Sequence, residues 1–462
     1  MNSKLIKSAE RVFAIVISAL ALSLLVFRAT HAGAIWRDEA NSLQLAVMPT
    51  LQDVWHNLAF DSFPLLFNLI LRAYVDLFGT NDFVLRAFGI AVGALMVAVA
   101  WWNARALAAG VPIIFLAIVG TNATWLDSGT AARGYGVGAL AILIAFGLAA
   151  NLVTRPNRKR LFVFAIVCLI AVHLVYFNIA LVAAISAGLI AVFVLRKQLH
   201  CAVAVGAIAV VCFISWIPYL QLFASLDWRV VLTAAADLSI RNMLIKFGEM
   251  VGNGTIALAV IWFVSVLAVL LAGARHLIRS LRQSPDSNMP TLLFAVTTAL
   301  TGLVFQYIFL RSVEYSPQPR YFLGLFVIMT AIAELVAGIL VQRSSVRVTR
   351  CALASGIIFI SSVTAWPKLA RRQTNIDIVA DTLQKNAGPD DLIVIDRETV
   401  GVSFNWYYRG TTHWETVPIL PDHRLHRDDL LKAKMMEQEP IRDLEDEIAK
   451  TLRAANRACP CL

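Results

Sequence analysis

Two adjacent acids, Asp38 and Glu39, directly follow the first long apolar segment, within the stretch Ile35–Ser42. A carboxylate at this position could act as a general base and accept the proton of an attacking hydroxyl. An acid at the membrane surface can also meet a headgroup that is held in the bilayer. The alternative is a solvated loop anchored by Trp36. We take the two acids as candidate catalytic residues and Arg37 as a candidate for binding substrate.

Basic and aromatic residues at the starts of two later apolar helices are candidates for binding a phosphate. Arg133 and Tyr135 begin one helix, and Arg320 and Tyr321 begin another, with Arg311 in the same short loop as Arg320. Guanidinium groups match phosphate oxygens, and positioned cations stabilise the charge that develops on a leaving phosphate. The alternatives are arginines that extend to lipid headgroups, an ion pair that orders the loop, and an aromatic-belt role for Tyr135.

His173 lies near Tyr176 and Asn178 at a tight turn between two apolar segments. A single histidine at such a turn can be purely structural. It could also contact a sugar hydroxyl or bind a metal ion. We therefore keep His173 and Tyr176 as candidates for binding substrate. His173 and Glu39 are the candidate ligands of a possible divalent cation.

Long runs of residues without charge predict the helices that must position these residues. Twelve apolar ranges occur, at roughly 12–30, 62–79, 83–103, 111–126, 134–153, 161–176, 177–195, 200–223, 255–274, 291–310, 320–342 and 350–367. A run of about 20 residues crosses about 30 Å of hydrocarbon. The range 62–79 contains Arg72 and Asp76, and its amphipathic pattern predicts a helix that lies at the membrane interface.

The distribution of basic residues supports eleven spans and a cytoplasmic N-terminus. With 62–79 excluded, the cytoplasmic loops hold most of the basic clusters, namely Arg105; Arg155, Arg158, Lys159 and Arg160; Arg196 and Lys197; Arg275, Arg279 and Arg282; and Arg343, Arg347 and Arg350. This is the charge bias that sets membrane topology. Counting 62–79 as a span would place these clusters outside. We predict an uncleaved anchor at the first segment and a multi-pass protein of the plasma (inner) membrane.

The residues after the last span form a separate region on the extracytoplasmic side. We expect a transmembrane domain over residues 1–367 and a small α/β domain over 368–462. Ile376–Asn386 has a helical pattern, Leu392–Ile395 resembles a short buried strand, and Arg427–Arg457 is a charged helical stretch. Because the chain stops soon after a helix, we expect this domain to be incomplete. The fold class is thus an all-α polytopic membrane protein with about eleven spans, interfacial helices and a C-terminal α/β domain.

Composition narrows the class of protein. The chain of 462 residues is 59% hydrophobic and 15% charged, whereas soluble domains carry about 25% charge. Its net charge of +10 comes mostly from clusters between apolar segments, which argues against nucleic-acid binding. Four cysteines are core hydrophobes, and Cys459 and Cys461 could oxidise outside the cytoplasm.

In this order, the motifs resemble those of the C-type integral-membrane glycosyltransferases, especially the bacterial protein O-mannosyltransferase-like and aminoarabinose-transferase-like proteins (glycosyltransferase family 39-like). The elements that carry the resemblance are Trp36-x-Asp38-Glu39-Ala40-x-Ser42, Ser62-Phe-Pro-Leu65, Ala131-Ala-Arg-Gly-Tyr-Gly-Val137, His173 with Tyr176, Arg320-Tyr321, Ala380–Ile395 and Tyr407–Gly410. The family's His-Pro-Pro-Leu and Glu-Ala-Arg elements lack their His and Glu here. The resemblance spans nearly the whole chain.

The resemblance implies a hexosyl or pentosyl transferase with a polyprenyl-phosphate-linked sugar donor and an envelope lipid, glycan or protein as acceptor. It implies that Asp38 is the base or orients the acceptor, with inversion at the anomeric carbon. Arg133, Arg320 and Arg311 would hold the donor phosphate, and some relatives bind a divalent cation. We expect a monomer in the lipid bilayer, with acids and arginines meeting on its outer side. A lipid or solute transporter (a flippase) and a non-catalytic scaffold are the alternatives.

Overall fold

The structure is a computed structural model that describes residues 3–107, 110–224, 237–283, 286–314, 316–340 and 344–458. Cys459 and Cys461 lie outside these ranges. The chain forms two compact units. Unit 1 comprises the described residues of Met1–His31, Leu85–Tyr219 and Ala235–Arg371, and unit 2 those of Ala32–Val84, Leu220–Ala234 and Arg372–Leu462. The predicted domain boundary between residues 367 and 368 stays a prediction.

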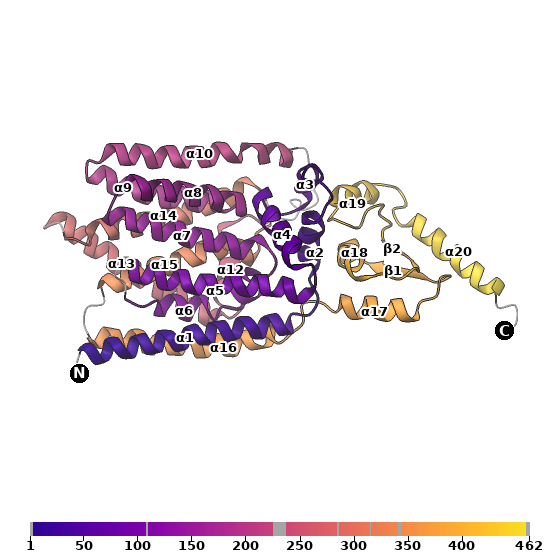
Figure 1. The fold of residues 1–462 in the computed structure, drawn as a ribbon, viewed down its shortest axis with the longest axis horizontal. Coiled ribbons are helices and arrows are strands. Elements are labelled where there is room, and N and C mark those ends of the chain that lie inside the picture. The colour runs from indigo at the N-terminus through magenta and orange to yellow at the C-terminus, as the bar shows by residue number, and fades with distance from the viewer. Residues whose placement is uncertain are drawn as a thin grey trace. The chain divides into compact units, whose positions relative to one another are not determined.

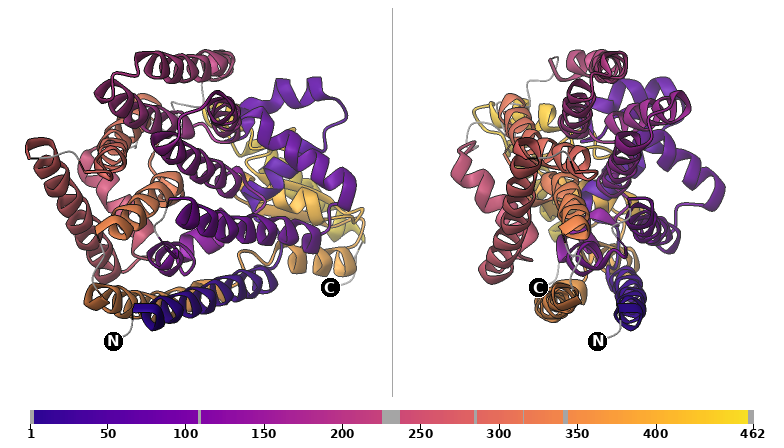
Figure 2. Two further views of the ribbon diagram at one scale, coloured as in Figure 1. Left: turned by 60° about the vertical axis from the view of Figure 1, so that its left-hand side comes forward. Right: turned by 90° about the vertical axis from the view of Figure 1, so that its left-hand side faces the viewer.

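Unit 1 consists of long helices, most of which run side by side (Figure 1). Their bounds are α1 Ser3–His31, α5 Asp82–Ala106, α6 Ile113–Val119, α7 Gly134–Thr154, α8 Arg158–Leu174, α9 Asn178–Leu195, α10 Leu199–Ala224, α12 Ile240–Val251, α13 Ile256–Arg282, α14 Met289–Ser312, α15 Leu323–Leu340 and α16 Ser344–Leu369. Two short turns also belong to the unit, η2 Trp125–Gly129 and η3 Pro319–Phe322. Residues 82–84 at the start of α5 and 220–224 at the end of α10 fall in unit 2. In the right-hand view of Figure 2, many of these helices are seen closer to end-on.

The helices of unit 1 are those of an all-α polytopic membrane protein. Nine helices in the described part of the chain are long and apolar enough to cross a membrane. Two further predicted ranges, 111–126 and 161–176, correspond to the seven-residue α6 and the 17-residue α8. The predicted count of eleven spans therefore stays a prediction. The excluded range 62–79 forms the 14-residue helix α4, Leu65–Phe78, in unit 2.

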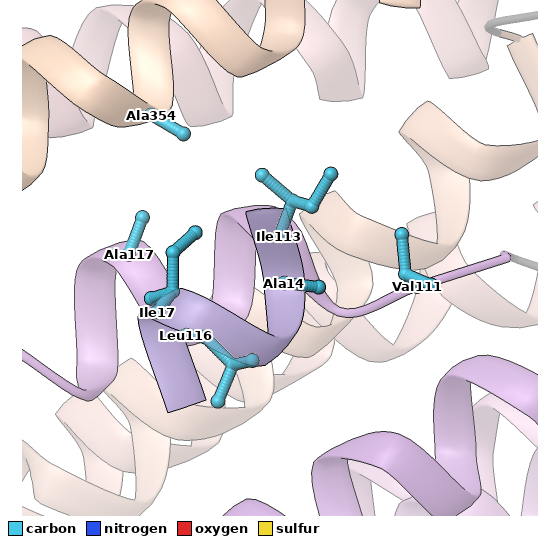
Figure 3. Close-up of a cluster of buried hydrophobic side chains, with 7 residues drawn as sticks. All are labelled: Ala14, Ile17, Val111, Ile113, Leu116, Ala117 and Ala354. Carbon is cyan, nitrogen blue, oxygen red and sulfur yellow. The ribbon is translucent and has the colours of Figure 1, made fainter. Parts of the chain in front are cut away.

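The helices pack closely because their apolar residues form continuous faces. Helix α9 packs along α14 and α7, and α7 also contacts α8 and α15. Figure 3 shows one core cluster at the contact of α1, α6 and α16, which includes Ile17, Leu116 and Ala354. This pairing brings the first and the last long helix of the unit together.

A buried charged network ties α1, α15 and α16. Glu334 of α15 lies 3.5 Å from Arg350 and accepts the backbone N–H of Phe115 at 2.8 Å. Glu10 of α1 pairs with Arg347 at 2.8 Å and with Arg350 at 3.4 Å. Sequence patterns did not single out Glu334. Because buried charges are stable only when paired, these contacts account for an acid inside a predicted span.

Unit 2 begins with short helices from the first predicted outer loop. They are α2 Arg37–Ala46, α3 Leu51–Asn57, η1 Leu58–Phe60 and α4. Trp36 caps α2, and Thr50 caps α3 by accepting the backbone N–H of Asp53. Helix α2 packs against α4, so the amphipathic segment is part of this unit.

The C-terminal part of unit 2 is a small α/β arrangement, as predicted. Its elements are α17 Ile376–Asn386, β1 Leu392–Asp396, α18 Glu398–Tyr407, β2 His413–Val417, α19 Asp428–Met435 and α20 Arg442–Ala458. The strands pair in parallel, with Leu392 opposite His413, as a connecting helix requires. The charged stretch 427–457 forms two helices, because the chain turns between Met435 and Arg442.

Candidate functional site

Asp38 lies in the first turn of α2, next to charged groups of unit 2. Its Oδ1 is 3.4 Å from Arg37 Nε and 3.6 Å from His426 Nε2. The side chain of Asp38 is 15% exposed, so its neighbours enclose most of it. The Asp38 carboxylate thus lies beside the Arg37 guanidinium of its own helix and the His426 imidazole of the C-terminal part of the unit.

Glu39 faces the start of its own helix. Its Oε2 accepts the backbone N–H of Trp36 at 3.0 Å, and the residue is 3% exposed. An acid here also interacts favourably with the helix dipole. Glu39 thus shapes the loop that holds Asp38, while its predicted catalytic and metal-binding roles stay predictions.

A buried polar network behind Asp38 was not indicated by the sequence. Asp61 accepts hydrogen bonds from Ser42 Oγ at 2.9 and 3.1 Å and from Asn68 Nδ2 at 3.3 Å. Asn41 donates to the carbonyl of Phe60 at 3.0 Å. These contacts fix the α2 face that follows Asp38. Ser42 belongs to the first-loop motif, so the motif combines a candidate base with its structural support.

The C-terminal part of unit 2 is hydrogen-bonded to the segment around Asp38. Tyr407 Oη accepts the backbone N–H of Ile35 at 2.8 Å and donates to Asp82 Oδ1 at 2.6 Å. Gln44 Nε2 donates to the carbonyl of Val402 at 3.0 Å, and Asn405 Nδ2 donates to Gln44 Oε1 at 2.7 Å. The loop with Asp38 is thus held by residues more than 300 positions away in the sequence.

A small, narrow pocket lies in the C-terminal part of unit 2. Its polar lining includes Glu398, Asp422, His423, His426 and Asp428. Burial raises the pKa of Asp428, and the nearby Glu398 acts in the same direction. Burial lowers the pKa of His423. Burial opposes ionisation of Asp422, but its hydrogen bonds from Arg424 lower its pKa. The pocket thus combines acids with different proton affinities.

Unit 1 holds the candidate phosphate-binding residues together. The guanidinium carbons of Arg133 and Arg320 lie 5.8 and 6.0 Å from the centre of the Tyr135 ring. The rings of Tyr135 and Tyr321 are 6.2 Å apart, and Arg320 is also 5.8 Å from the Tyr321 ring. Arg133 is buried, so the structure joins two predicted arginines around a predicted tyrosine.

The loop that carries Arg133 is held in place by glycines and by an ion pair between Asp127 and the buried Arg28. A Cβ at Gly136 would lie 1.6 Å from the carbonyl oxygen of Gly129, and one at Gly89 would lie 1.5 Å from that of Thr130. Arg28 pairs with Asp127 at 2.6 Å. Side chains are therefore excluded where α5 and α7 meet this loop, which fixes the backbone before Arg133.

The remaining candidates of unit 1 differ in their surroundings. His173 Nδ1 is 3.0 Å from Tyr219 Oη and its Nε2 is 3.1 Å from Ser215 Oγ. The Tyr176 ring packs 5.5 Å from that of Tyr219. These contacts join α8 to α10. Arg311 is exposed in the last turn of α14.

The predicted divalent cation gains no support from the described contacts. His173 is engaged by Tyr219 and Ser215, and Glu39 by the backbone of Trp36. Among the residues that the structure describes, no group of three or more His, Cys, Asp or Glu side chains could hold a metal ion. The cation stays a prediction.

Comparison with known proteins places the fold. No protein-family model and no curated protein matches the sequence. The chain is similar to the structure of ArnT from Cupriavidus metallidurans bound to undecaprenyl phosphate, with 12% identity over 92% of this chain and 88% of that chain and a TM-score of 0.54.

Two structures of the Archaeoglobus fulgidus oligosaccharyltransferase are also similar to the chain. One is a complex with Zn and sulfate, with 11% identity over 88% of this chain and a TM-score of 0.54. The other is tethered to an acceptor peptide containing the NVT sequon, with 12% identity over 89% of this chain and a TM-score of 0.53. This chain covers only 62% and 64% of those chains. The chain therefore shares its fold with ArnT and with the Archaeoglobus fulgidus oligosaccharyltransferase.

Proposed function

We propose that the protein transfers a sugar from a polyprenyl-phosphate donor to an envelope lipid, glycan or protein at the outer face of the plasma membrane. The observation that carries this proposal is the Arg133–Tyr135–Arg320 cluster in a fold similar to that of ArnT bound to undecaprenyl phosphate. A buried arginine beside a second one suits a phosphate better than a neutral solute.

The donor phosphate is proposed to bind Arg133 and Arg320. Both side chains lie over aromatic rings, which restrict the motion of the two guanidinium groups. As the bond from the sugar to the phosphate breaks, negative charge grows on the leaving phosphate. Two fixed guanidinium groups stabilise that charge more than they stabilise the donor itself. Arg311 is proposed to add a third positive charge.

Asp38 is proposed to take the proton of the acceptor. The acceptor hydroxyl oxygen forms a bond to the anomeric carbon, and its proton passes to the Asp38 carboxylate. The bond between the anomeric carbon and the phosphate oxygen breaks, and the polyprenyl phosphate leaves with that electron pair. Attack opposite to the leaving phosphate inverts the anomeric carbon.

The transporter alternative is not favoured by the fold comparison, because ArnT and oligosaccharyltransferase are among the similar solved structures. A transporter needs ionisable groups that are exposed to a substrate path between its membrane-spanning helices. The buried Glu334 is instead paired with Arg350 and with a backbone N–H.

Binding of undecaprenyl phosphate to the full-length protein in detergent tests the donor site. Arg133→Gln and Arg320→Gln should each weaken binding roughly 10- to 100-fold, because each removes charge-assisted hydrogen bonds of about 1.5–3 kcal/mol. Arg133→Lys should not restore full affinity, since an ammonium cannot contact two phosphate oxygens as a guanidinium fork does.

Arg105→Gln is the matched control. Arg105 also lies over an aromatic ring, that of Trp101 at 5.1 Å, but it is in the last turn of α5, at the end that is predicted to be cytoplasmic. Its substitution should leave the affinity unchanged. Equal affinities for wild type, Arg133→Gln and Arg320→Gln would remove the two arginines from the donor site.

A further inference from the structure

The segment that follows β2 returns to the helix that carries Asp38. Its His426 donates its backbone N–H to Asn41 Oδ1 at 2.7 Å, and Asn41 is almost fully buried. The next residue, Arg427, places its guanidinium 4.6 Å from the centre of the Phe60 ring. Two neighbouring residues of this segment are therefore fixed by residues of the first loop. These contacts hold His426 in a fixed position beside α2.

The imidazole of His426 lies among charged groups from three helices. Its Nε2 is 3.6 Å from Asp38 Oδ1, the oxygen that Arg37 also approaches. Asp428 of α19 and Glu398 of α18 line the same pocket as His426. His426 thus contacts both the pocket and the candidate base.

The two ring nitrogens of His426 are enclosed and hydrogen-bond to no residue that the structure describes. A buried polar group without a partner is costly, and such groups in folded proteins call for an explanation. Hydrogen bonds in catalytic sites are often long before substrate binds and shorten afterwards. A separation of 3.6 Å between Nε2 and a carboxylate oxygen fits this behaviour.

We propose that His426 is a positioning residue for Asp38, which aligns the carboxylate for proton transfer when an acceptor hydroxyl approaches it. This inference rests on the proposed function. His426 does not take the acceptor proton. It holds the Asp38 carboxylate through one Nε2–H···Oδ1 contact, while Asn41 holds the backbone of His426. The C-terminal region is then part of the acceptor site.

The test uses the full-length protein in membranes and measures initial rates of transfer. The donor is undecaprenyl phosphate carrying the sugar that is missing from the envelope of a strain lacking the gene. His426→Gln should lower kcat roughly 10- to 100-fold, a part of the 10²- to 10⁴-fold typical of a general base, with the KM for the donor changed less than about twofold. His426→Lys places an ammonium group near Asp38 and should retain more activity than His426→Gln.

A double-substitution cycle separates positioning from a structural role. Residues that act as a unit show non-additive losses. The variant with both Asp38→Asn and His426→Gln should therefore be no slower than Asp38→Asn alone. His413→Gln is the matched control, because His413 is an exposed histidine of the same region that pairs with Glu415 at 3.2 Å. It should transfer sugar at the wild-type rate.

The possible failures can be told apart. If wild type transfers no sugar, or Asp38→Asn is as fast as wild type, the proposed function is overturned and this inference with it. If Asp38→Asn is slow but His426→Gln is normal, only the inference is overturned. Additive losses, or a raised KM with unchanged kcat, would also overturn it. If His426→Gln does not fold, the rate of His426→Lys decides, and a rate as low as that of Asp38→Asn contradicts the proposal.

Discussion

Asp38 gains its proposed role from its neighbours as well as from its own carboxylate. Adjacent acids after a first apolar helix are visible in the sequence, and so are the arginines at helix starts. The role of His426 was not visible, because nothing in the sequence marks a histidine that lies 3.6 Å from an acid nearly 400 residues earlier. Asp428 likewise has no motif around it. Contacts of this kind depend on how distant segments fold together.

Asp428 makes protein stability depend on pH. Burial raises the pKa of its carboxyl, so the folded protein holds this proton more tightly than the unfolded chain does. Stability is therefore lost as pH rises from the ordinary Asp value of about 4 through the raised pKa. The melting temperature of Asp428→Asn should increase relative to that of wild type as pH rises from about 4 to 7.5. Thermal unfolding in detergent measures this difference.

Asp429 provides a control of opposite sign. Burial opposes its ionisation, but its hydrogen bonds with Arg427 outweigh burial and lower its pKa. Its contribution to stability is present above the ordinary Asp value and is lost as pH falls through the lowered pKa. Asp429→Asn should therefore lose melting temperature relative to wild type as pH rises. The same trend for both variants would contradict this account.

At the scale of elements, the pattern of apolar residues predicts long helices well and short helices poorly. Helix α17 was predicted with its observed bounds, and strand β1 within one residue, because each is bounded by turn residues or a break in polarity. The division of 427–457 into α19 and α20 was missed, since both parts are charged and helical in pattern. Segments such as α6 are apolar throughout, so the sequence does not show where the helix ends.

Tyr407 is predicted to stabilise the contact between α18 and the first loop. Tyr407→Phe removes a hydroxyl that bridges the Ile35 N–H and Asp82, and this should cost about 1–3 kcal/mol, a few degrees in melting temperature. Tyr408→Phe is the control, because the Tyr408 hydroxyl is 3.5 Å from the carbonyl of Thr412, at the limit of a hydrogen bond. Equal losses for the two variants would show that the Tyr407 bridge adds nothing.

At the scale of the whole molecule, the sequence predicted the fold class because hydrocarbon thickness sets the length of each apolar run. The resemblance of its motifs to C-type glycosyltransferases agrees with a fold similar to those of ArnT and oligosaccharyltransferase. The sequence could not predict that residues 32–84 and 372–462 belong to one compact unit. That grouping arises from buried polar contacts such as those of Tyr407 and Gln44, which leave no periodic signal.

The most direct test of the central claim is mass spectrometry of the cell envelope. A strain that lacks the gene is complemented with wild type, Asp38→Asn or the control Asp76→Asn, all at equal membrane levels. Asp76 is an exposed acid of the same unit, on α4. Wild type and Asp76→Asn should restore a sugar on an envelope component, and Asp38→Asn should restore at least about 100-fold less. Equal restoration by Asp38→Asn, or no sugar that depends on the gene, would contradict the account.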